Sequence, residues 1–163
     1  MSAQPPPRPG IAQKLLAERQ QLPGLIPQEI AIFKAWWAVH EHEYTSADFN
    51  VRVGVGVDPG AQFDEATRRT AVMSTQYRVD ALLHTGNQAH IVEVKFRASP
   101  LVLGQILSYR ELWLRSNPGQ QQPILRVLYF QTNDDTLYVL DKFGVLHDQV
   151  DADFSTIKVT KQI

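Results

Sequence analysis

Two β-rich runs separated by a Gly-Asn pair constrain the fold of this chain more than any other feature. The runs cover residues 77–83 and 90–96, and Gly86-Asn87 between them is typical of a two-residue hairpin turn. Because side chains alternate across a strand, each run sorts into two faces. One face is apolar and is predicted to face a core. Its members are Tyr77, Val79, Ala81, Leu83, Val92, Val94 and Phe96.

The other face of the hairpin gathers charged side chains. The turn predicts that Asp80 faces Glu93 and that Arg78 faces Lys95. Opposed residues on paired strands lie about 5 Å apart, where like charges destabilise the pair. Two explanations of the facing carboxylates stay open here. Either they bind a divalent cation that prefers oxygen ligands, Mg²⁺ or Mn²⁺, or Arg78 and Lys95 neutralise them in an ordinary surface cluster.

A helix is predicted directly after the hairpin. Ser99-Pro100 offers a capping hydroxyl and a proline at the first helical position, and residues 117–119, Asn-Pro-Gly, end the helix. Gln105 and Tyr109 are four residues apart and so share one face of it. The charged hairpin is therefore followed by a helix face that presents an amide and a phenol.

An acid, an E-x-K triplet and a Q-x-x-x-Y motif thus follow one another along the hairpin and the helix. They are Asp80, then Glu93-Val94-Lys95, then Gln105 with Tyr109. This order resembles the PD-(D/E)XK nuclease superfamily, and the trailing Q-x-x-x-Y is similar to its RecB and lambda-exonuclease branch. The E-x-K triplet alone occurs by chance in most proteins, but the full order is much more specific. The resemblance implies an α/β fold (an α+β mixed sheet) with a restriction-endonuclease-like α-β-β-β-α-β core.

The resemblance also implies a role for each site residue. The implied catalytic residues are Asp80, Glu93, Lys95, Gln105 and Tyr109. The implied Mg²⁺ or Mn²⁺ ligands are Asp80, Glu93, the backbone carbonyl of Val94 and Glu29. Lys95 would orient or help deprotonate the attacking water and stabilise developing charge, and Gln105 and Tyr109 would position the nucleophile or the phosphate. For Glu29, a simple helix-dipole role in the first turn of its helix remains an alternative.

One position departs from the family pattern. RecB-like members usually carry glycine three residues before the aspartate, where this chain has Tyr77. The bulk of that ring is expected to narrow access to the strand.

Charge distribution bears on a nucleic-acid partner. The net charge is −1, yet residues 68–126 hold eight basic and three acidic residues. A phosphate-tracking surface and a merely solvated charged face are both consistent with this excess. The predicted DNA contacts are Arg78 and Arg97 near the site, with Arg68 and Arg69 carried toward it by a short helix or mobile loop within residues 61–75.

The rest of the chain is expected to form one domain with an N-terminal extension. Residues 1–24 are predicted to be a proline-rich arm followed by a short helix at residues 11–21, and residues 25–163 the nuclease-like domain. We expect the arm to lie against a neighbouring subunit, in a homo-oligomer or a larger protein assembly. A helix should begin at Pro27. Further strands are predicted at residues 49–57, 124–132 and 136–143, of which the last is an extra C-terminal strand beyond the core.

Composition excludes several classes of site. The chain has no cysteine, which rules out disulfides, a thiolate nucleophile, thiolate-bound zinc and an iron–sulfur cluster. No apolar run is long enough to span a membrane and no signal-peptide pattern is present, so we expect a soluble protein without a membrane partner, cytoplasmic or associated with a virion.

These features predict that the protein is a metal-dependent DNA nuclease that acts in recombination, repair or DNA processing. The alternative from another class is a structural component of a phage particle or DNA-packaging assembly that has a nuclease-like fold and little or no activity.

Overall fold

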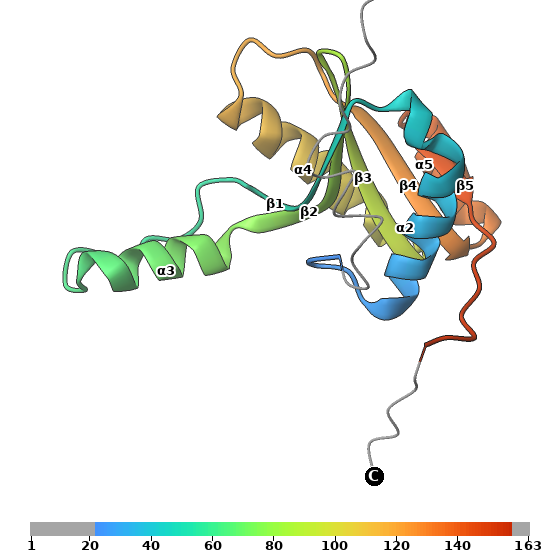
Figure 1. Ribbon diagram of the computed structural model, residues 1–163. Coiled ribbons are helices and arrows are strands. Elements are labelled where there is room, and N and C mark those ends of the chain that lie inside the picture. The colour runs from blue at the N-terminus through green and yellow to red at the C-terminus, as the bar shows by residue number, and fades with distance from the viewer. Residues whose placement is uncertain (1–21, 158–163) are drawn as a thin grey trace, which may run out of the picture.

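The computed structural model describes residues 22–157, which are built around one five-stranded mixed sheet (Figure 1). The strands lie side by side in the order β1-β2-β3-β4-β5. Their bounds are Ser46–Val53, Tyr77–Thr85, Gln88–Arg97, Ile124–Gln131 and Leu146–Gln149. The first three strands are antiparallel, whereas β4 and β5 run parallel to β3. Strand β3 is therefore central and is paired along both edges.

Helices cover both faces of this sheet and create two cores. Helix α2 (Pro27–His40) continues into the short helix η1 (Glu41–Glu43) and packs its aromatic side chains on one face. Helix α4 (Leu101–Ser116) packs on the other face. Apart from η1 and helix α3 (Glu65–Thr75), which is inserted between β1 and β2, the order α2-β1-β2-β3-α4-β4 reproduces the predicted α-β-β-β-α-β core. The mixed α/β fold is confirmed, and it is consistent with a restriction-endonuclease-like fold.

The central hairpin has the predicted turn and register. Strands β2 and β3 pair antiparallel from Thr85 opposite Gln88 to Ala81 opposite Val92, as the Gly86-Asn87 turn requires. Gly86 has a φ of +59°, the left-handed conformation that glycine adopts without steric cost. The hairpin prediction is confirmed for this part of the ladder.

The predicted division of the hairpin into two faces is wrong at one point. Ala81 belongs to the core beneath α2, but Val79 belongs to the core beneath α4, although regular alternation would place both on one face. On β1 the same change of side separates Phe49 from Val51. Asn50 lies between them with a φ of +55°, a left-handed conformation that deforms the strand locally.

The second correction concerns residues 134–142, which form helix α5 (Asp134–Lys142) and not a strand. Asn133 caps this helix, because its side-chain oxygen accepts hydrogen bonds from the backbone N–H and the hydroxyl of Thr136. Asn133 therefore marks a helix start, with Asp134 and Asp135 in the first turn, where the helix dipole favours negative charge. Helix α5 carries the chain over to β5, a C-terminal strand that lies beyond the residues predicted to form one.

The start of α4 also differs in detail. Pro100 occupies the N-cap position, and no side-chain cap is present, so Ser99 does not cap the helix with its hydroxyl. The backbone carbonyls of Ser99 and Pro100 instead accept hydrogen bonds from Val102 and Leu103.

Helix α3 (Glu65–Thr75) projects from the body of the molecule (Figure 1). None of its residues is buried, and β2 begins directly after it. The helical alternative for residues 61–75 is therefore correct.

Leu22, at the first described position, is buried in the core beneath α2. The predicted arm at residues 1–10 and the helix at residues 11–21 lie outside the described residues. In the part of the chain that is described, no helix has the length and apolar character needed to cross a bilayer.

Candidate active site

Glu93 lies at the centre of the site, on the central strand and beneath α4. Its side chain is completely buried. Its Oε1 atom accepts hydrogen bonds from Lys95 Nζ at 2.7 Å and from Gln105 Nε2 at 2.5 Å. Its Oε2 atom is buried as well and accepts no hydrogen bond from a donor within residues 22–157, although the Asp80 carboxyl lies within hydrogen-bonding reach of the Glu93 carboxyl. A buried carboxylate oxygen without a partner is costly, so this atom is a candidate coordination position for a cation.

Two side chains of α4 complete this part of the site. Gln105 lies one turn before Tyr109, and its Nε2 atom also donates a hydrogen bond to the Tyr109 hydroxyl at 2.8 Å. Tyr109 is buried between α4 and the sheet. The structure thus brings Glu93, Lys95, Gln105 and Tyr109 together in one hydrogen-bonded chain, as the sequence pattern predicts.

Asp80 joins the site where the β2–β3 pairing ends. Beyond Ala81 the two strands no longer form ladder pairs, and the Asp80 carboxylate accepts the backbone N–H of Val94 at 2.9 Å. This side-chain contact replaces a strand–strand hydrogen bond. It leaves Asp80 beside Glu93 through a local break in the ladder, where the sequence predicts a regular facing pair.

The two carboxyl groups are strained electrostatically by burial and by each other. Burial raises the pKa of Glu93 to about 8, and the nearby charge of Asp80 contributes in the same direction. Burial likewise raises the pKa of Asp80 to about 6, against the lowering effect of the Val94 hydrogen bond and of the Lys95 charge. Burial lowers the pKa of Lys95, but the charge and hydrogen bond of Glu93 outweigh this effect and the pKa lies above its usual value. One ammonium group therefore does not neutralise the pair.

Glu29 lies in the first turn of α2, on the opposite side of the sheet from α4. Its Oε2 atom accepts the backbone N–H of Ile26 at 3.2 Å and so caps the helix. Its negative charge also raises the pKa values of Asp80 and Glu93, which places it in the electrostatic surroundings of the site. Glu29 thus caps its helix and also lies near the site.

The donor set fits a divalent cation with few protein ligands. Asp80 and Glu93 offer carboxylate oxygens, including the unpartnered Oε2, and oxygen donors suit Mg²⁺ or Mn²⁺. No group of three or more acidic, histidine or cysteine side chains close enough to hold a metal occurs within residues 22–157. Glu29 therefore does not complete a three-carboxylate cluster in this arrangement. The remaining ligands would come from the Val94 carbonyl and from water, as Mg²⁺ sites commonly allow.

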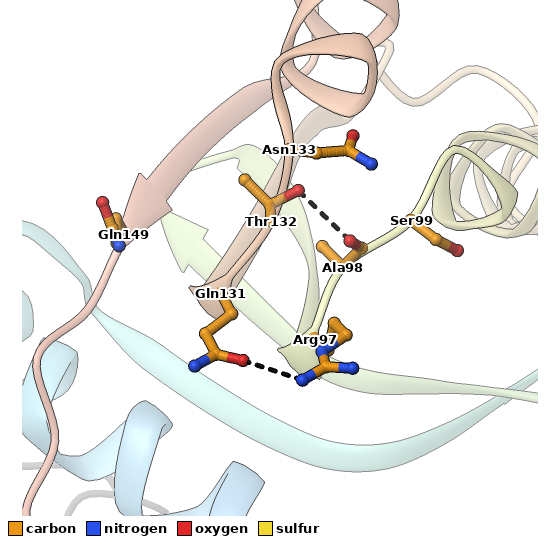
Figure 2. Close-up of a pocket in the computed structure, with 7 residues that line it drawn as sticks. All are labelled: Arg97, Ala98, Ser99, Gln131, Thr132, Asn133 and Gln149. Atoms are coloured by element: carbon orange, nitrogen blue, oxygen red, sulfur yellow. Dashed lines mark hydrogen bonds between the residues drawn. The ribbon is translucent and has the colours of Figure 1, made fainter.

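Arg97 lies two residues beyond Lys95 on β3 and lines a surface cavity of about 400 Å³ at the ends of β3, β4 and β5 (Figure 2). The cavity is lined by Arg97, Ala98, Ser99, Gln131, Thr132, Asn133 and Gln149. Figure 2 shows the Arg97 guanidinium directed at the Gln131 amide, to whose oxygen it donates a hydrogen bond at 3.1 Å. None of the five predicted catalytic side chains lines this cavity.

Arg68 and Arg69 are not brought to the acid pair. Both lie on the projecting helix α3, and Arg68 forms a two-point ion pair with Asp58, in which its Nη2 atom lies 2.5 Å from the carboxylate. Arg78 does lie close in sequence to the site, two residues before Asp80 on β2.

Tyr77 takes an exposed position at the start of β2. Its ring is 61% exposed and lies 6.4 Å from the ring of Tyr109, measured between centroids. The Tyr77 ring, which is expected to narrow access to the strand, thus lies beside the Tyr109 phenol of the site.

Arg52 was not singled out by the sequence pattern, yet the ladder places it directly opposite Arg78. The alternation within residues 49–57 marks a strand, but only the register with β2 shows which residue faces Arg78. That register depends on a long connection and cannot be read from the sequence by turn chemistry.

Comparisons with known proteins find similarity only at the level of three-dimensional structure, and that similarity is weak. The sequence matches no protein-family model and no curated protein sequence. Its fold resembles a repair endonuclease from Pyrococcus abyssi with a TM-score of 0.41 and 13% identity over 47% of this chain and 34% of that one. It also resembles a protein of unknown function with a TM-score of 0.47 and 12% identity over 74% of this chain and 56% of that one. The chain thus spans about a third and just over half of the lengths of these two proteins, and its function has to be inferred from its own side chains.

Proposed function

We propose that this protein is a metal-dependent DNA nuclease of the PD-(D/E)XK type, which hydrolyses phosphodiester bonds in recombination, repair or DNA processing. The observation that carries the proposal is the buried Glu93 carboxylate, which lies beside a second, partly buried acid, Asp80, and whose Oε2 atom has no hydrogen-bond partner within residues 22–157. A purely structural role gives no reason to hold two carboxylates, one of them fully buried, together with one ammonium group. A divalent cation between them removes the repulsion.

Asp80 and Glu93 would hold the cation, with the Val94 carbonyl as a further ligand. When bound, Mg²⁺ or Mn²⁺ supplies charge stabilisation at the phosphoryl oxygens and lowers the pKa of water. The protein's own part is to hold the two carboxylates fixed. Val94 N–H anchors Asp80, and Gln105 anchors Glu93.

Lys95 is the residue best placed to act on the reacting groups. Its Nζ atom is held at 2.7 Å from Glu93, on a side chain that is only 29% exposed. From there it can orient the attacking water and stabilise the negative charge that develops on the phosphate. Gln105 positions the Glu93 carboxylate directly, and Tyr109 holds Gln105 in turn.

Digestion of linear and circular DNA by the purified protein tests this proposal. Mg²⁺ or Mn²⁺ should support cleavage, EDTA should abolish it, and Glu93→Gln and Lys95→Ala should lower the rate by about 100-fold or more. Glu111→Gln is the matched control, because Glu111 is an exposed acid on α4 that pairs only with Arg110. It should retain the wild-type rate.

Absence of cleavage with either metal, from a protein whose variants all fold, would contradict the proposal. The second candidate, a structural component of a phage or DNA-packaging assembly, would then be favoured. It is supported by the lack of a three-acid cluster within residues 22–157. That candidate predicts a large stable oligomer, held together through the N-terminal arm, that is inert toward DNA.

A further inference from the structure

The outer end of the β1–β2 ladder places two arginines face to face. Arg52 of β1 and Arg78 of β2 are register partners, between the pairs Val51–Val79 and Val53–Tyr77. Opposed residues of paired strands project from the same face of a sheet. The two guanidinium groups therefore share one face, opposite the valines that pack toward α4. Like charges in this arrangement destabilise the strand pair.

No acid of the described chain relieves this repulsion. Within residues 22–157 neither Arg52 nor Arg78 forms an ion pair or a side-chain hydrogen bond. Asp58 is occupied by Arg68, and Asp80 accepts the N–H of Val94. The paired arginines are thus a concentrated positive charge without a counter-ion.

The pair lies next to the acid site along the same strand. Arg78 precedes Asp80 by two residues, a separation of about 7 Å along a β-strand. Figure 1 shows β1 and β2 leading outward from the body of the sheet toward α3. Helix α4 covers the valine face of this end of the ladder, where Leu112 lies against Gly54, so the arginines lie on the other face, away from α4. Asp80 is within the electrostatic reach of Lys95 on the α4 side and of Glu29 on the α2 side, so it lies where the two faces meet. A chain of phosphates that reaches Asp80 can therefore continue over the two arginines.

We propose that Arg52 and Arg78 form a phosphate-binding site that holds the nucleic-acid backbone beside the bond to be cleaved. This inference rests on the proposed nuclease function and names the group that its substrate presents. Guanidinium groups bind phosphate oxygens through paired charge-assisted hydrogen bonds, and one phosphate between two guanidinium groups removes their repulsion. The contact is with the backbone, so it carries affinity and position without base sequence.

The test is the salt dependence of binding to a labelled DNA duplex, measured by fluorescence anisotropy in EDTA so that no cleavage occurs. Arg52→Ala and Arg78→Ala should each reduce the slope of log K against log salt by about 0.9, and the double variant by about 1.8. Arg115→Ala is the control, because Arg115 is an exposed arginine in the last turn of α4. It should keep the wild-type slope.

Thermal unfolding at low salt provides a second readout. If the arginines repel each other, each alanine variant should unfold at or above the wild-type temperature while binding DNA less tightly. Loss of stability in both single variants would mean that the arginines support the fold through contacts of their own, and it would overturn the inference. An unchanged salt slope in the folded double variant would do so as well.

The outcomes separate this site from the nuclease proposal. Arginine-dependent binding without cleavage in Mg²⁺ or Mn²⁺ would refute the nuclease and leave the phosphate site in place. Cleavage by the wild type, combined with wild-type salt dependence in the double variant, would refute the phosphate site alone.

Discussion

Glu93 is a buried carboxylate with two different oxygens. Lys95 and Gln105 satisfy Oε1, whereas Oε2 has no partner. Two donors on one oxygen fix the orientation of the group and leave the other oxygen available. This asymmetry suits a metal ligand, because both lone pairs of Oε2 remain available to a cation while Oε1 holds the group in place.

The raised pKa values make the stability of the metal-free protein depend on pH. An acid whose pKa is higher in the folded state binds more protons there, so stability falls as pH rises between the unfolded and folded pKa values. For Glu93 this window runs from its ordinary value of 4.5 to about 8. The fall should be on the order of a few kcal/mol.

Urea unfolding across this pH range checks the expectation. Glu93→Gln has no ionisable group at this position, so its unfolding free energy should lose much less than that of the wild type over the same window. Equal pH profiles for the wild type and Glu93→Gln would show that the carboxylate is not strained. Excess Mg²⁺ should flatten the wild-type profile, because a bound cation stabilises the ionised pair.

At the scale of the elements, α5 shows how a cap decides between helix and strand. The run at residues 136–143 is rich in residues that suit a strand, and the sequence predicts a strand there. Asn133 overrides this preference by capping Thr136, and Leu140 then turns into the core beneath α4. The helix also provides the crossover that a parallel β4–β5 pair requires.

Removing that cap should weaken the protein measurably. Asn133→Ala is expected to lower the free energy of unfolding by about 1 kcal/mol, because the N–H and hydroxyl of Thr136 lose their acceptor. Asn133→Asp should remain close to wild type, since aspartate caps equally well. A denaturant titration in which both variants match the wild type would contradict the role assigned to Asn133.

The hairpin and the helix after it could be predicted because their signals are local. The Gly86-Asn87 turn fixes the register of β2 and β3, and a spacing of four residues fixes the shared face of Gln105 and Tyr109. The break at Asp80 and the pairing of Arg52 with Arg78 could not be predicted from the sequence, because both depend on how β1 pairs with β2. That ladder joins strands separated by the whole of α3 and is deformed at Asn50.

At the scale of the whole molecule, the sheet brings opposite charges to neighbouring positions. The central strand β3 carries Glu93, one member of the acid pair, together with Lys95. The paired strands β1 and β2 carry Arg52 and Arg78. A site that binds a cation at its centre and phosphates at its margin needs this arrangement. The net charge of −1 conceals it, because charges elsewhere in the chain cancel in the sum.

Calorimetric titration of Mn²⁺ into the metal-free protein tests the central claim most directly, because it requires neither DNA nor turnover. The wild type should bind Mn²⁺ with a resolvable heat, Glu93→Gln should lose this binding, and the surface control Glu111→Gln should retain it. Absence of Mn²⁺ binding by the wild type, or equal binding by wild type and folded Glu93→Gln, would contradict the assignment of the acid pair as a metal site.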